Sequence, residues 1–152
     1  MTIDHTSVER SDIANFYDLA DSNHDTDSLQ ELLTTAASHS SSHEWKLAQS
    51  YILWRLSRFQ DALCLLNSLP QSLHSNILFW IFKGLVLRSL DSDLSAIYNC
   101  YVEAYKIDNS RFDVVYNLAN ISFELDHDFC EPLFVKSLDL NPFNADLSLI
   151  HI

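Results

Sequence analysis

The chain has 152 residues, of which 47% are hydrophobic, and this predicts about one folded domain rather than a disordered segment. It contains a single glycine and three prolines, which disfavours all-β folds and nucleotide-binding folds, because those need glycine-rich turns or phosphate loops. The net charge of −12 predicts that the chain binds neither nucleic acid nor a membrane surface, since phosphate backbones and anionic lipids would repel it.

Capping and turn residues predict a series of short helices along the chain. Thr6 with Glu9, and Asp27 with Gln30, have the spacing of helix capping boxes, and a serine-rich run at 38–42 interrupts the helical pattern. The predicted helices span about residues 6–19, 27–37, 43–56, 59–69, 76–90, 93–107, 112–125 and 129–140. Elements of this length joined by short turns indicate an all-α protein.

The acidic residues are concentrated near the N-terminus. Residues 1–44 carry nine acidic side chains against Arg10 alone, a net charge of −8. Two interpretations stay open: a basic partner binds this segment, or its acids serve only to keep the surface soluble.

Cysteine usage and hydropathy indicate the cellular compartment in which the protein is expected. Cys64, Cys100 and Cys130 are odd in number and lack the spacing of a zinc site or a disulfide framework. The N-terminus is polar rather than signal-like, and no apolar run reaches the ~18 residues that span a bilayer. The sequence therefore predicts a reduced, cytoplasmic protein.

The predicted helices repeat at intervals of 34–35 residues. Small residues recur in both helices of the pairs, where the backbones approach, and large residues fill the space beside each contact, as close packing of antiparallel helices requires. The clearest series, with steps of 35 and 34 residues, are Trp45, Trp80 and Val115, and then Ala62, Ala96 and Cys130. Because one such pair cannot cover its own apolar face, successive pairs are expected to stack.

This pattern resembles the tetratricopeptide repeat (TPR) family, whose signature combines W-x2-L-G-x2-Y, A-x3-F and P. Trp80, Gly84 and Ala96 match it in the middle repeat, Pro142 matches it in the last, and Lys83 departs from it where the family has leucine. The resemblance implies an α-solenoid of antiparallel helix pairs, a TPR-like right-handed superhelix that serves as a scaffold for protein binding.

The resemblance also divides the chain. Residues 1–41 are expected to be an acidic helical segment, either a capping element or an eroded repeat. Three degenerate repeats are expected at 42–75, 76–110 and 111–144, and residues 145–152 read as the start of a further helix. A fragment of a longer protein, self-association through the C-terminal edge, and a frayed tail all stay open for this last segment.

In a TPR array the first helix of each pair lines a concave groove, and the resemblance implies that protein segments bind there. Of the five positions that form a carboxylate clamp for chaperone tails in the family, this chain matches only one, with Lys46. The other four positions are occupied by Ser50, Phe82, Asp113 and Asn117. The expected ligand is therefore an apolar or amphipathic segment of a partner, unless the N-terminal helices fill the groove. The expected groove residues are Lys46, Leu53, Leu78, Ile81, Leu85, Tyr116, Asn117, Asn120 and Phe123.

Residues that could carry chemistry are few. His39 and His43 have helical spacing but lack a third ligand, and His127 with Cys130 at a predicted helix start is better explained by packing of the cysteine. We therefore expect no metal, no cofactor and no catalytic residues. The predicted function is a protein–protein interaction module. Two alternatives are the N-terminal TPR region of a larger enzyme such as a glycosyltransferase, and a small acidic chaperone of a bacterial secretion system.

Overall fold

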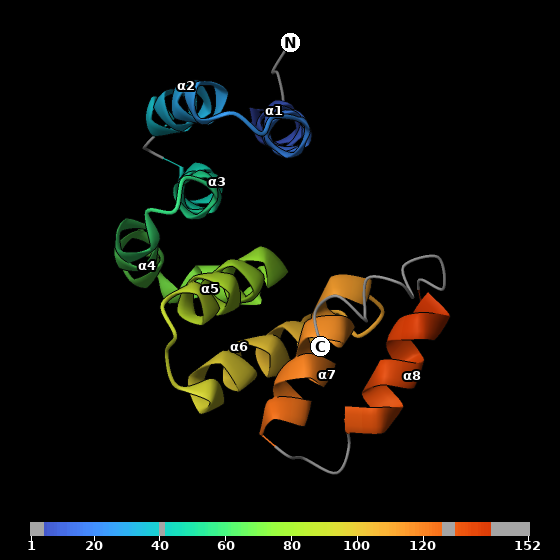
Figure 1. Ribbon diagram of the computed structural model, residues 1–152. Coiled ribbons are helices and arrows are strands. Elements are labelled where there is room, and N and C mark those ends of the chain that lie inside the picture. Colours follow the sequence, from blue (N-terminus) through green and yellow to red (C-terminus); the bar gives the residue numbers. More distant parts are fainter. Residues whose placement is uncertain (1–4, 40–41, 126–129, 141–152) are drawn as a thin grey trace. The chain divides into compact units, whose positions relative to one another are not determined.

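The structure is a computed structural model that describes residues 5–39, 42–125 and 130–140. Within these ranges the chain forms α-helices and one 3-10 turn and no strand, as the sequence predicts. The elements are α1 (His5–Ser22), α2 (Thr26–Ala37), α3 (His43–Arg55), α4 (Phe59–Asn67), η1 (Gln71–Ser75), α5 (Ile77–Ser89), α6 (Leu94–Ile107), α7 (Phe112–Glu124) and α8 (Cys130–Leu140). Figure 1 shows their order along the chain.

The helix starts correct two details of the prediction. Thr6 lies inside α1, so it does not cap that helix. Asp25, and not Asp27, caps α2: its carboxylate accepts a hydrogen bond of 3.1 Å from the Ser28 N–H. The earlier start follows because Asp25 is extended, as an N-cap residue must be, while Asp27 already lies in the first turn.

The chain folds as two compact units, Met1–Gln71 and Ser72–Ile152. In unit 1, α1 contacts both α2 and α3, α2 contacts α3, and α3 contacts α4. Phe16 of α1 packs edge-on against Trp45 of α3, with ring centroids 5.2 Å apart. Ala62 of α4, one of the predicted small residues, is fully buried, and so is Ala48 of α3. The first helices of the chain are therefore part of the same packed core as α3 and α4.

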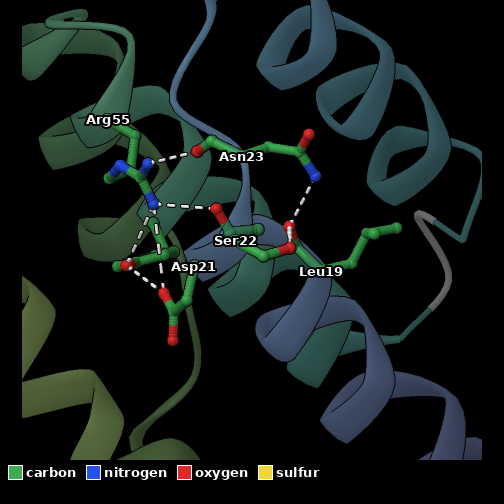
Figure 2. Close-up of polar contacts among 7 residues, drawn as sticks. Leu19, Asp21, Ser22, Asn23 and Arg55 are labelled. Atoms are coloured by element: carbon green, nitrogen blue, oxygen red, sulfur yellow. Dashed lines mark hydrogen bonds and ion pairs between the residues drawn. The ribbon is translucent and has the colours of Figure 1, made fainter.

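A guanidinium group fastens α1 to α3 within unit 1 (Figure 2). Arg55, near the end of α3, donates hydrogen bonds to the carbonyl oxygens of Ala20 at 3.0 Å and Asn23 at 2.6 Å. The Tyr51 hydroxyl beside it donates to Asp21 at 2.6 Å. Because the last carbonyls of a helix lack partners within the helix and carry a partial negative charge, a cation at this position stabilises the end of α1.

In unit 2, α5 contacts α6, α6 contacts α7, and α7 contacts α8. Gly84 of α5 lies against the ring of Tyr101 of α6, so close that a Cβ atom at position 84 would lie 3.0 Å from two ring carbons. This contact is the physical reason for the single glycine of the chain, which costs about 1 kcal/mol of helix propensity in mid-helix. Ile97, Tyr101, Leu118 and Ile121 form the buried cluster between α6 and α7.

Two helices end in the same backbone conformation without a glycine. Ser57 after α3 and Asp91 after α5 have φ angles of 63° and 52°, in the left-handed region. In both turns the next amide N–H bonds back over one helical turn, from Arg58 to the Leu53 carbonyl at 2.8 Å and from Ser92 to the Leu87 carbonyl at 3.0 Å. This pattern is a Schellman cap, which usually places glycine at the left-handed position. The two caps lie at equivalent places in the 34–35-residue spacing.

Candidate protein-binding surface

The predicted groove residues of unit 2 lie on α5 and α7 and differ in accessibility. Ile81 and Tyr116 are buried, whereas Phe123 is 58% exposed. Leu78, Leu85, Asn117 and Asn120 are partly exposed. In unit 1, Lys46 is partly exposed and Leu53 is buried. The structure thus offers Phe123 as the most accessible apolar side chain among the predicted groove residues.

An ion pair joins α5 to α7 next to Phe123. The Arg88 guanidinium meets the Glu124 carboxylate through both of its terminal nitrogens, with one of the two bonds at 2.8 Å. Hydrogen bonding to Glu124 raises the pKa of Arg88. Both side chains are roughly two-fifths exposed, so water screens the pair and its net stabilisation is about 1 kcal/mol or less. The pair links the C-terminal turns of α5 and α7.

Polar residues at the start of α7 are committed to the helix itself. The Asp113 carboxylate accepts hydrogen bonds from Arg111 Nε at 2.7 Å and from the Val114 N–H at 2.9 Å. The Asn117 amide donates to the Asp113 carbonyl at 2.7 Å. Among the described residues, no hydrogen bond of the Asn120 side-chain amide is found, and this residue is partly exposed.

Sequence reasoning did not identify Glu124 as part of this surface. The spacing of 35 residues places Arg88 and Phe123 at equivalent positions, and Glu124 follows directly. The contact between Arg88 and Glu124 is seen only in the structure. A shift of one residue within a repeat decides whether two side chains meet across neighbouring helices, and the sequence spacing does not give that shift.

The residues weighed for chemistry have structural surroundings. The His39 ring stacks on Trp45, with centroids 4.3 Å apart, which accounts for it as a packing residue. Burial raises the pKa of the Cys100 thiol to about 11, so this thiol is protonated and unreactive near neutral pH. His127 and the Cys130 side chain lie outside the described residues. Over the ranges that the structure describes, no three His, Cys, Asp or Glu side chains gather as metal ligands would.

In the described residues, none of the helices combines the length and the apolar character that crossing a bilayer requires.

Comparison with known proteins adds to the description of the fold. No protein-family model and no curated protein sequence matches the chain. Solved structures do match, among them MamA residues 41 to the end from Desulfovibrio magneticus RS-1 and a MamA RS-1 double mutant. The TM-scores are 0.66 and 0.68, the sequence identity is 14% in each case, and the alignments cover 88% of this chain and 75% of the other. MamA is a TPR-containing protein, so the chain has a TPR-like all-α fold of paired helices.

Proposed function

We propose that this chain is a non-catalytic protein–protein interaction module that binds an apolar or amphipathic segment of a partner protein on the surface formed by α5 and α7. The observation that carries the proposal is Phe123, an aromatic side chain that is 58% exposed on a first helix of a TPR-like pair. Aromatic anchors surrounded by polar groups dominate the affinity of many protein interfaces. Here Asn120 and the Arg88–Glu124 pair supply the polar surroundings.

The arrangement of helix contacts supports a division into repeats. We propose the pairs α3/α4, α5/α6 and α7/α8 as the repeats at 42–75, 76–110 and 111–144. In unit 1, α2 contacts α3 as α6 contacts α7 in unit 2, the second helix of one pair against the first helix of the next. By the same criterion, we propose that α1/α2 is a fourth, eroded pair. Residues 145–152 lie outside the described residues, so the further helix expected there stays a prediction.

The test places a photoreactive p-benzoylphenylalanine at position 123 in cells of the source organism. We expect one partner to cross-link at this position and not at position 107, because Ile107 is also exposed and apolar but lies at the end of α6. Phe123→Asp should lower capture of that partner about tenfold or more, with an unchanged far-UV circular dichroism spectrum. Equal capture by Phe123→Asp and by Ile107→Asp would exclude this surface.

Self-association through the C-terminal edge is a second part of the proposal. The expected edge, residues 145–152, lies outside the described residues, but α8, which precedes it in the sequence, exposes Val135, Leu138 and Leu140. Val135 and Leu138 lie about one turn apart on the same side of α8, and such exposed apolar groups favour contact with another apolar surface. Sedimentation at increasing concentration should show a rising mass that Leu138→Asp abolishes, and a constant monomer mass would contradict this part.

A further inference from the structure

Unit 1 contains a pocket of about 650 Å³ between α2, α3 and α4. Leu33 and Ala37 of α2, Leu53 of α3 and Leu65 of α4 give it an apolar lining, and Thr34 and Cys64 lie at its walls. The pocket is formed mainly by α2 and α4, the second helices of their pairs. It is therefore separate from the proposed binding surface on α5 and α7, and it does not depend on the proposal made for that surface.

The charged groups that line the pocket, Arg58 and Asp61, and the Thr34 hydroxyl are engaged within the protein, while Gln30 and Gln49 add uncharged amides to the lining. The Arg58 guanidinium holds the Asp61 carboxylate, with contacts of 2.9 and 3.0 Å to one carboxylate oxygen. The Thr34 hydroxyl donates to the Gln30 carbonyl at 3.1 Å. With its one cation neutralised by a neighbouring acid, the pocket lacks a free charge to hold a small anion. Its lining suits an aliphatic side chain, because burying apolar area is the gain that such a site offers.

Charge around the pocket restricts the kind of chain that can carry that side chain. Asp27 and Glu31 lie one turn apart on α2, on the same side as Gln30 and Thr34 of the pocket. Neither forms an ion pair with any described residue. Residues 1–71 contain ten acidic and four basic side chains, a net charge of −6. Two of those basic side chains, Arg55 and Arg58, are bound within unit 1. A ligand that approaches the pocket therefore meets a negative field.

From this apolar lining beside unpaired acids, we propose that the α2–α3–α4 pocket docks an aliphatic side chain presented by a lysine- or arginine-rich segment of a partner protein. The aliphatic group fills the pocket, and the basic residues next to it face Asp27 and Glu31. An acidic or uncharged apolar segment binds less well, because it lacks the electrostatic attraction that steers and holds the basic one.

The test uses three fluorescein-labelled synthetic peptides and measures fluorescence anisotropy. The probe is a helix-forming peptide with leucines on one face and lysines elsewhere. One control replaces its lysines with glutamates and the other replaces its leucines with serines. We expect the lysine–leucine probe to bind at least about tenfold more tightly than either control, and its affinity to fall as salt is raised. Equal binding of the glutamate peptide would overturn the proposal.

Two threonines on α2 provide a matched pair of variants. Thr34 lines the pocket, whereas Thr35 is equally exposed, makes the same kind of hydrogen bond at 3.1 Å, and does not line it. Thr34→Trp should fill the pocket and weaken the probe at least about tenfold, while Thr35→Trp should change its affinity by no more than about twofold. Glu31→Lys should weaken it about threefold through lost attraction. If Phe123→Asp abolishes probe binding and Thr34→Trp does not, the probe binds elsewhere and the proposal fails.

The exposed thiol of Cys64 gives a readout on the wild-type protein, so no variant has to fold. We expect the probe to slow modification of Cys64 by 5,5′-dithiobis(2-nitrobenzoate) at least about threefold, as followed by mass spectrometry of tryptic peptides, because a bound side chain excludes the reagent. An unchanged rate at saturating probe would contradict the assigned pocket.

Discussion

Among the described residues, unit 1 and unit 2 each contain four α-helices, but different chemistry joins neighbouring helices in the two units. In unit 1, Arg55 reaches main-chain carbonyls at the end of α1, and its side chain is only 16% exposed. In unit 2, the bare backbone at Gly84 admits the Tyr101 ring, and the one guanidinium pair between described first helices, Arg88–Glu124, lies in water. The same residue spacing is therefore compatible with different interactions between neighbouring helices.

The two arginines show why this difference matters for stability. A half-buried guanidinium bonded to carbonyls loses its partners and leaves them unsatisfied when it is removed, which costs more than breaking an exposed ion pair. The stability of unit 1 should therefore depend on Arg55, and the stability of unit 2 on the close packing of Tyr101 against Gly84.

The largest effect is expected at Gly84. Gly84→Val should destabilise unit 2 by about 3 kcal/mol, because the added carbons cannot fit beside the Tyr101 ring at 3.0 Å. Chemical denaturation followed by circular dichroism measures the loss. In a Tyr101→Leu background the same substitution should cost clearly less, since the shorter side chain leaves room. An equal cost in both backgrounds would show that the ring contact is not the cause.

Removal of Arg55 should have the next largest effect. Arg55→Ala should lower the free energy of unfolding of unit 1 by about 2 kcal/mol, through loss of the bonds to Ala20 and Asn23. Hydrogen exchange should accelerate in α1 and much less in unit 2. The matched variant Arg88→Ala should cost about 1 kcal/mol or less and should lose its effect in high salt. A larger loss for Arg88→Ala than for Arg55→Ala would reverse the comparison.

Alkaline pH should weaken unit 2 through its buried thiol. Burial raises the pKa of Cys100 from 9.0 to about 11, so the folded state keeps a proton that the unfolded state releases in this interval. Stability from this group is complete below about pH 9 and is lost as the pH rises to 11, at up to ~1.4 kcal/mol per pH unit. Cys100→Ala should show a shallower decline in the free energy of unfolding over the same interval, and an unchanged slope would exclude the thiol as its source.

The smallest effect is an increase in stability, expected at the two helix ends that have the same left-handed cap, one in each unit. Ser57→Gly and Asp91→Gly should each raise the free energy of unfolding by about 0.5–1 kcal/mol, because glycine adopts positive φ without the steric cost of a side chain. The gain should appear in both units as a higher midpoint of thermal unfolding. A matched substitution at Ser89, which lies inside α5, should destabilise instead.

The sequence predicted the helices well where apolar spacing and caps agree. Asn76 caps α5 and Asp93 caps α6 through hydrogen bonds to the amides of Leu78 and Ser95, close to the expected starts at 76 and 93. The prediction failed to place the start of α2, because several capping residues occur between 25 and 28 and only the backbone conformation selects Asp25. It predicted helix ends near 56 and 90, close to Arg55 and Ser89, but gave no signal for the left-handed backbone of Ser57 and Asp91, because neither is the glycine that usually marks such a position.

The candidate surface was less predictable than the helices. Register placed Tyr116 and Phe123 on the same face of α7, yet the first is buried and the second is exposed, because exposure depends on the neighbours that each meets. The partner of Arg88 and the pocket beside Leu53 both arise from contacts between residues far apart in the chain. Whether Lys46, Leu78 and the other predicted groove residues bind a partner stays a prediction for the experiments above.

By itself, the sequence determined that this protein is all-α, that its helical residue pattern recurs at intervals of 34–35 residues, and that a glycine at position 84 marks a close approach between helices. These properties follow from local periodicity and side-chain size, which a single chain records directly. Only the tertiary structure decided that the ring of Tyr101 fills the space beside Gly84, that Arg55 fastens α1, and that the apolar pocket opens between α2 and α4. Every residue has a main-chain carbonyl, so the sequence does not show which side chain will bond to a given carbonyl or line a given cavity. Only the folded structure shows these contacts.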